Sequence, residues 1–210
     1  MFIGHYSAAF VAKALVPDAP LPMLMVSAQL IDVAFCCLVL ARLERAEIDP
    51  GDNPTVPLRT DHIPISHGFE MAFVWSAVAA LIATFIYPNV STAALWAIAL
   101  TCLSHWALDF VVHTGDLPFA LNRMKVGLGL WRYRGPSIAL ELGLILLGTA
   151  VLAAAEGVTA WKVWTVGGAM VAMQLFAFFA PPPAPVIRLI GSMIVLYAAM
   201  TWAGWWIEAP

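Results

Sequence analysis

"STAALWAIALTCLSHWALDFVVH", residues 91–113, is the stretch that decides the fold. It is longer than the about 20 largely apolar residues that a membrane-spanning helix needs. His105, Asp109 and His113 follow one another at intervals of four residues, so they share one face of a helix. Ionisable groups are costly in hydrocarbon and usually face a bundle interior or a wet cavity. The stretch therefore predicts a spanning helix with a chemically active inner face.

The composition predicts a polytopic membrane protein. The chain has 210 residues, of which 62% are hydrophobic and 11% charged, whereas a soluble domain has about a quarter charged residues. We expect an all-α transmembrane bundle of six to seven helices, forming a single domain over residues 1–210. No basic tract or recognition motif points to nucleic acid as a partner. Spans are expected at about 21–43, 66–88, 91–113, 137–155, 160–180 and 186–207, and residues 3–16 are expected either to cross obliquely or to form a half-helix.

The positive charges predict the orientation in the lipid bilayer. Two long polar loops, about 44–64 and 114–135, fall on the same side of the predicted spans. The opposite side has only Lys13 and Lys162. The positive-inside rule then places the long loops and the N-terminus in the cytoplasm and the C-terminus outside. The loop side carries Arg42, Arg45, Arg59, Arg123, Lys125, Arg132, Arg134 and Arg188.

All five histidines also sort to the loop side, and acidic residues accompany them. Asp32 lies within a span, and Glu70 follows His67 on the same helical face. Imidazole and carboxylate together suit zinc, manganese or iron(II), and a divalent cation would compensate buried carboxylates. The sequence predicts one or two metal ions, with zinc favoured. The expected ligands are His5, Asp32, His62, His67, His105, Asp109 and His113.

Simpler roles exist for the same residues. His113 can be a hydrogen-bonded packing residue at a helix end, and His105 with Asp109 can form a proton relay or an interhelical hydrogen bond. Glu70 is also favourable in the first turn of its helix, where the helix dipole is positive. Glu141 can pair with an arginine such as Arg134.

Four short motifs occur in a fixed order over residues 1–115, the motif-bearing half of the chain. They are Gly4-His5, Leu30-Ile31-Asp32, His62-Ile63-Pro64-Ile65-Ser66-His67, and Ser104-His105 with Asp109. This pattern resembles the YdjM-like membrane-bound metal-dependent hydrolases, a family of bacterial inner-membrane proteins. Ala34 stands where that family has a second aspartate, which leaves Glu70 or His113 to take its place. The remaining helices, about 136–207, match only in being hydrophobic and are expected to support the site.

The resemblance implies a hydrolase in a bacterial inner (plasma) membrane. A metal ion there would activate water, with Asp109 or Glu70 orienting it or acting as general base. The location suggests a lipid-like ester or phosphoester as substrate. Gly127 and Gly129 would let the backbone approach a headgroup. The residues expected to hold that headgroup are Arg123, Lys125, Arg132 and Arg134, although topology and attraction to anionic lipids explain the same charges.

Two other function classes fit the same residues. Intramembrane His and Asp can carry protons or metal ions through a transporter. The grouping of charges on one side favours a one-sided site over a conduit. A non-catalytic accessory subunit, in which a metal only staples helices together, predicts bound metal without turnover.

Overall fold

The computed structural model describes residues 2–49, 55, 56, 58–181 and 185–210. The described chain is 69% helical, and six of its helices are long and apolar enough to cross a membrane, which confirms the predicted all-α bundle of a multi-pass membrane protein. A short 3-10 helix, η1 (Ile3–His5), leads into the helices, which are α1 (Tyr6–Leu15), α2 (Leu21–Leu40), α3 (Phe69–Ile86), α4 (Thr92–Val112), α5 (Arg134–Ala153), α6 (Ala160–Phe179) and α7 (Val186–Glu208).

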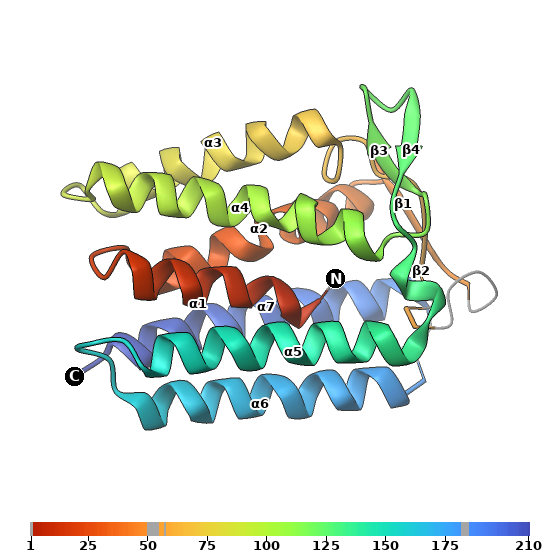
Figure 1. Ribbon diagram of the computed structural model, residues 1–210. Coiled ribbons are helices and arrows are strands. Elements are labelled where there is room, and N and C mark those ends of the chain that lie inside the picture. Colours follow the sequence, from red (N-terminus) through yellow and green to blue (C-terminus); the bar gives the residue numbers. More distant parts are fainter. Residues whose placement is uncertain (1, 50–54, 57, 182–184) are drawn as a thin grey trace.

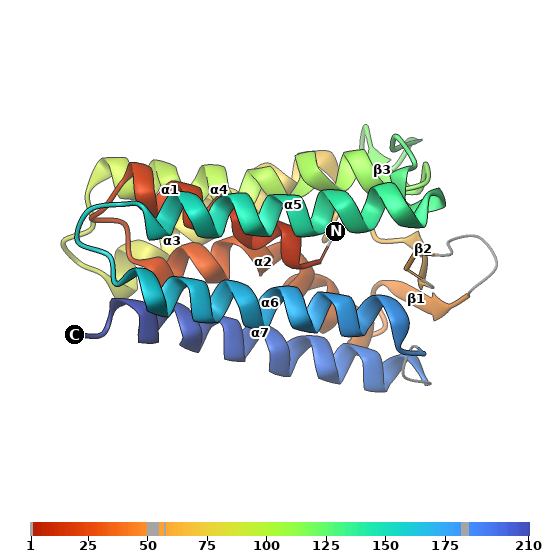
Figure 2. The ribbon, with the colours of Figure 1, turned by 60° about the horizontal axis from the view of Figure 1, so that its bottom comes forward.

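The long helices run side by side along one axis (Figures 1 and 2). Two small hairpins, β1–β2 and β3–β4, lie at one end of the bundle, and the C-terminus lies at the other. We call these the hairpin end and the C-terminal end. The two polar segments that the sequence places on one side do lie at the same end.

The helices begin and end where local chemistry requires it. The Ser91 hydroxyl accepts the Ala94 N–H at 3.0 Å and caps the start of α4. Helix α3 ends at Ile86, shortly before Pro88, which cannot continue the helical hydrogen bonds. Helix α5 begins at Arg134, earlier than predicted, because Pro136 is tolerated in a first helical turn.

Helix α1 is a half-helix. Its 10 residues span about 15 Å, half of what a membrane crossing requires. The described chain begins within the length of the bundle, not at one end (Figures 1 and 2). There the backbone N–H groups of Phe2 and Gly4 donate to the Glu141 carboxylate, both at 2.9 Å. Glu141 therefore anchors the first described residues, and the alternative in which it pairs with Arg134 is not what the structure shows.

Small residues bring neighbouring helices into close contact. A side chain at Gly148 would meet the Ser7 backbone at 2.8 Å, and one at Gly167 would meet the Thr149 hydroxyl at 2.4 Å. These contacts seat α1 and α6 on α5, as small residues commonly do in membrane bundles. Helix α7 packs chiefly on α2 instead. The aromatic contact between α6 and α7, Trp161 with Trp206, lies at the C-terminal end.

The two hairpins were not predicted, because their strands are short and lie in polar segments. Strands β1 (Arg45–Ile48) and β2 (Leu58–His62) pair antiparallel, as do β3 (Leu117–Phe119) and β4 (Met124–Val126). The Thr60 hydroxyl donates to Asp116 at 2.7 Å and joins the two hairpins. Gly127 has a φ of 148°, and a side chain there would lie 2.3 Å from the His113 carbonyl oxygen. Gly127 thus approaches the end of α4, whereas the sequence interpretation assigned this approach to a headgroup.

Candidate metal centre

Six ionisable side chains from several elements converge inside the hairpin half of the bundle. All of them are buried, with at most 7% of the residue surface exposed. Helix α4 supplies two of them, as its four-residue spacing predicts, and another closes its C-terminus. The others come from η1, from α2 and from the turn before α3. They are His5, Asp32, His67, His105, Asp109 and His113, which we call the His/Asp cluster.

The imidazole Nε2 atoms of the cluster lie against carboxylate oxygens. His105 Nε2 is 3.2 Å from Asp109 Oδ2, His5 Nε2 is 3.3 Å from Asp109 Oδ1, and His67 Nε2 is 3.3 Å from Asp32 Oδ1. Charge-assisted N–H···O bonds are typically shorter, about 2.7–2.9 Å. Two ligands bound tetrahedrally to one ion, at bonds of about 2.0–2.1 Å, lie about 3.3 Å apart. The observed separations are therefore compatible with ligands that share an ion.

The cluster contains two overlapping ligand sets that can hold a metal ion. One is His5, His105 and Asp109, and the other is Asp32, His67 and His105, with the ligand atoms of each set within 4.8 Å of one another. His105 belongs to both sets. Its one ligand nitrogen can bind only one ion at a time, so the two sets compete for it. His113 Nε2 lies 3.8 Å from Asp109 Oδ2, the same carboxylate oxygen that His67 and His105 face. It is therefore placed to bind an ion beside Asp109 as a further ligand.

Contacts outside the cluster fix which nitrogen of each ring faces inward. His105 Nδ1 lies 2.8 Å from the Ala28 carbonyl oxygen, and His113 Nδ1 lies 2.9 Å from Asp116 Oδ1. Both oxygens can only accept, so both Nδ1 atoms carry the proton. In the neutral form of these rings the Nε2 lone pairs then face carboxylates, an arrangement that a divalent cation stabilises. An Nδ1 proton donated to an outer acceptor is also the usual arrangement around a metal-bound histidine.

His67 is oriented through a relay that begins at Glu44. The Glu44 carboxylate accepts the Ser66 backbone N–H at 2.8 Å and the Ser66 hydroxyl at 2.6 Å. The Ser66 oxygen therefore keeps a lone pair for the Nδ1–H of His67, 2.8 Å away. Glu44 also accepts the N–H of Ile65 at 2.8 Å, so it holds the whole turn before α3. His67 again presents Nε2 to the cluster.

Sequence reasoning missed three outer partners: Glu44, Asp116 and Tyr197. The Tyr197 hydroxyl donates to Asp32 Oδ2 at 2.9 Å. Asp116 lies in the loop after α4, where burial favours its neutral form, but hydrogen bonds from His113 and Thr60 hold its pKa well below the usual range. Only Asp116 carried a local signal, because it follows His113 by three residues. Tyr197 is 165 residues from its partner, so no spacing could have found it.

The structure does not bring all predicted site residues together. His62 is exposed on β2, opposite Arg45, and lies outside the cluster. Glu70 accepts the Leu121 N–H at 3.2 Å and thereby contacts the turn of the β3–β4 hairpin instead of the cluster. Neither residue is placed to act on a group bound at the cluster.

The four basic residues proposed for a headgroup also separate. Arg123 and Lys125 are exposed in the β3–β4 hairpin. Arg132 donates to the Thr114 carbonyl at 3.1 Å, and Arg134 donates to the carbonyl of Phe178 at the end of α6. Of the four, Arg134 is the residue that touches the lining of the cavity beside the cluster.

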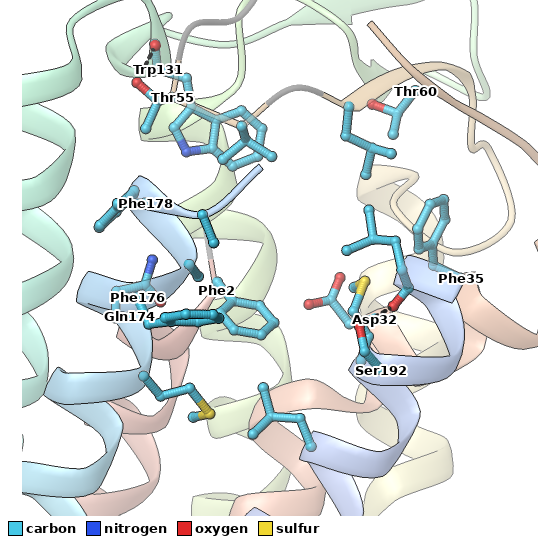
Figure 3. Close-up of a pocket in the computed structure, with 18 of the residues that line it drawn as sticks. Phe2, Asp32, Phe35, Thr55, Thr60, Trp131, Gln174, Phe176, Phe178 and Ser192 are labelled. Carbon is cyan, nitrogen blue, oxygen red and sulfur yellow. Dashed lines mark hydrogen bonds between the residues drawn. The ribbon is translucent and has the colours of Figure 1, made fainter. Parts of the chain in front are cut away.

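That cavity has a volume of about 760 Å³ and is lined mostly by apolar side chains. Four cluster residues belong to its polar lining: Asp32, His67, Asp109 and His113. Figure 3 shows Gln174, Phe176 and Phe178 on one wall, and Asp32, Phe35 and Ser192 on the other. The buried His/Asp cluster is therefore reachable from a large apolar space.

Comparisons of this chain with models of known protein families, with curated proteins and with solved structures gave no significant match.

Proposed function

We propose that this chain is a membrane-embedded, metal-dependent hydrolase that acts on a lipid-like ester or phosphoester. The observation that carries the proposal is the meeting of the His/Asp cluster with the apolar cavity. A site for a purely structural metal is usually closed, whereas a catalytic site keeps a position open to substrate. The resemblance of the four motifs to the YdjM-like hydrolases supports the same conclusion.

The donor set favours zinc, with manganese or iron(II) as substitutes. Nitrogen and carboxylate oxygen ligands without thiolate suit these ions. None of the three cysteines lies in either ligand set. Such an ion polarises the substrate's phosphoryl or carbonyl oxygen and lowers the pKa of water in the site.

The chain's own residues hold and orient the reacting groups. His67, His105 and Asp32 form the set nearest the cavity, because Asp32 and His67 also line it. Asp109 lies between His5 on one oxygen and His105 on the other, so it fixes the position of both rings. Tyr197 orients Asp32 by donating to Oδ2, which leaves Oδ1 toward His67. The apolar cavity limits access of bulk water to these atoms.

We place the hairpin end in the cytoplasm of a bacterial cell and the protein in its inner membrane. Eight basic residues lie at or beside the hairpin end, whereas Lys13 and Lys162 lie toward the C-terminal end (Figure 1). This asymmetry is what the positive-inside rule requires of cytoplasmic loops. A cluster at this end would act on lipids of the cytoplasmic leaflet.

The test is metal analysis of protein purified in detergent without a histidine tag or chelator. We expect one or two zinc, manganese or iron atoms per chain, lost in Asp109→Asn and His105→Gln. His62→Gln is the matched control and should keep its metal, because His62 is an exposed histidine outside the cluster. Release of fatty acid or headgroup from phosphatidylglycerol vesicles, followed by mass spectrometry, should disappear in the same two variants.

The outcomes separate the function classes. Wild-type protein without metal contradicts the hydrolase proposal and leaves the cluster as a proton path or a packing network. Bound metal without turnover of esters or phosphoesters favours the accessory subunit. Metal or proton flux in sealed vesicles, again without turnover, favours the transporter.

A further inference from the structure

The cavity beside the cluster opens sideways between α6 and α7. Among its lining residues, Phe176 on α6 and Val195 on α7 are 73% and 70% exposed. Both lie within helices that are apolar enough to span a membrane, so the opening faces lipid and not water. Helices α6 and α7 pack on different neighbours, α5 and α2, which leaves a gap between them toward the hairpin end.

The extent of the cavity matches one lipid leaflet. Its α7 wall runs from Leu189 to Ala199, a rise of about 15 Å along the helix. The hydrocarbon core of a bilayer is about 30 Å thick, so the cavity extends through the half that adjoins the hairpin end. A volume of about 760 Å³ is also in the range of small-molecule sites. These dimensions fit a hydrocarbon chain that lies along the helices within one leaflet.

One buried amide in the cavity wall calls for a polar partner from the ligand. Gln174 on α6 is 3% exposed and lines the cavity, and its Oε1 atom has no hydrogen-bond partner among the described residues. A buried amide without partners is costly. A hydroxyl near the head of a lipid can supply the missing hydrogen bond by donating to Oε1. Figure 3 shows Gln174 across the cavity from Asp32.

Positive charge lies at the hairpin end of the same opening. Arg134 donates to the Phe178 carbonyl, and its guanidinium lies 4.9 Å from the centre of the Phe179 ring. Arg188 is exposed in the first turn of α7, next to Leu189 of the cavity wall. Two arginines at the membrane surface favour an anionic headgroup.

We infer that the α6–α7 cavity admits one anionic phospholipid sideways from the leaflet at the hairpin end. One of its hydrocarbon chains lies along the cavity, a hydroxyl of its headgroup donates to Gln174 Oε1, and its phosphate lies near Arg134 and Arg188. The inference deepens the proposed function and rests on it in one respect, that the lipid held here is the substrate presented to the His/Asp cluster.

Two exposed glycines provide a matched pair of variants. Gly191 lies in α7 and lines the cavity opening, whereas Gly168 lies in α6 and does not line it. A side chain at either position meets nothing within 4 Å, so Gly191→Trp and Gly168→Trp should both fold. Ala177→Trp, from the α6 side of the opening, is an independent second plug.

Each protein is reconstituted in vesicles of equimolar phosphatidylglycerol and phosphatidylcholine, extracted in mild detergent, and analysed for retained lipid by mass spectrometry. We expect wild-type and Gly168→Trp proteins to retain phosphatidylglycerol. Gly191→Trp and Ala177→Trp should retain roughly tenfold less, because an indole overfills the opening. Arg188→Gln should reduce the preference for phosphatidylglycerol roughly fivefold without removing the lipid.

Equal retention in wild-type and plugged proteins overturns the inference, and so does wild-type protein that retains no lipid. A wild-type dimer that becomes monomeric in Gly191→Trp also overturns it, since a second copy then covers the opening. Metal content is measured in the same samples. Metal retained without lipid defeats the lipid inference alone, whereas lipid retained without metal defeats the proposed function alone.

Discussion

The two ends of the bundle compensate their ionisable groups in opposite ways. At the C-terminal end, the Lys13 ammonium pairs with the Glu208 carboxylate and also donates to the carbonyls of Pro17 and Ala19, both at 2.9 Å. Lys162 donates to the Ala209 carbonyl and lies 5.6 Å from the Trp206 ring. Each positive charge there meets an acceptor from the chain itself.

At the hairpin end the carboxylates of Asp32 and Asp109 meet imidazole nitrogens instead of lysine or arginine. Outer acceptors hold the Nδ1 protons of His105 and His113, so in the neutral rings the Nε2 lone pairs face the buried carboxylates. Such an arrangement is stable with a divalent cation and costly without one. The difference shows that one end satisfies its charges within the chain, whereas the other groups buried histidines and carboxylates that could hold a metal ion.

The strongest test of this difference is removal of metal from the purified wild-type protein. A ligand at about 1,000 times its dissociation constant stabilises the folded state by about 4 kcal/mol. For a chain of this size, that corresponds to a fall in Tm of roughly 8–16 °C when a chelator removes the metal. Thermal unfolding with and without chelator measures the effect.

Asp109→Asn is the control, because its cluster should already be empty and its Tm should not respond to chelator. An equal response in both proteins, or no response in the wild type, would show that the buried carboxylates are satisfied without a cation.

A smaller effect is expected from Glu44→Gln, which changes one oxygen outside the cluster. The variant weakens the relay through Ser66 that orients His67, and loss of such outer contacts typically costs 10–100-fold in metal affinity. Competition with a fluorescent zinc chelator measures that affinity. Glu47→Gln is the matched control, since Glu47 is exposed on β1 and pairs with Arg59 at 2.7 Å. Identical zinc affinities in the two variants would show that Glu44 stabilises the turn before α3 but does not affect metal binding.

The sequence predicts the parts of this molecule that depend on local spacing. The six spans, the half-helix option for residues 3–16, and the shared face of His105 and Asp109 follow from hydropathy and from the helical repeat. His105 and Asp109 need no tertiary information, because α4 is a continuous helix through both residues.

The errors arise where tertiary contacts decide. His62 and His67 both precede α3, yet only His67 reaches the cluster, because β2 pairs with β1 and holds His62 at the surface. A pairing of Glu141 with an arginine was one alternative, but Glu141 binds the backbone of Gly4 and Phe2, 137 and 139 positions away. The cavity could not be predicted, because it depends on how α6 and α7 pack on different helices. Hydropathy carries no information about that packing.

The smallest effect is expected from Glu208→Gln at the C-terminal end. Glu208 accepts from Lys13 and from the Leu21 N–H at 2.9 Å, and its side chain is 28% exposed. Partly exposed ion pairs contribute about 0–1 kcal/mol, so the Tm should fall by roughly 0–4 °C. Metal content and affinity should match the wild type, because Lys13 keeps its two carbonyl acceptors and the pair lies at the far end of the bundle. A loss of metal in this variant would mean that the two ends are coupled through α1, because His5 caps the start of α1 and Lys13 lies in its last turn. The contrast between the two ends would then not be local.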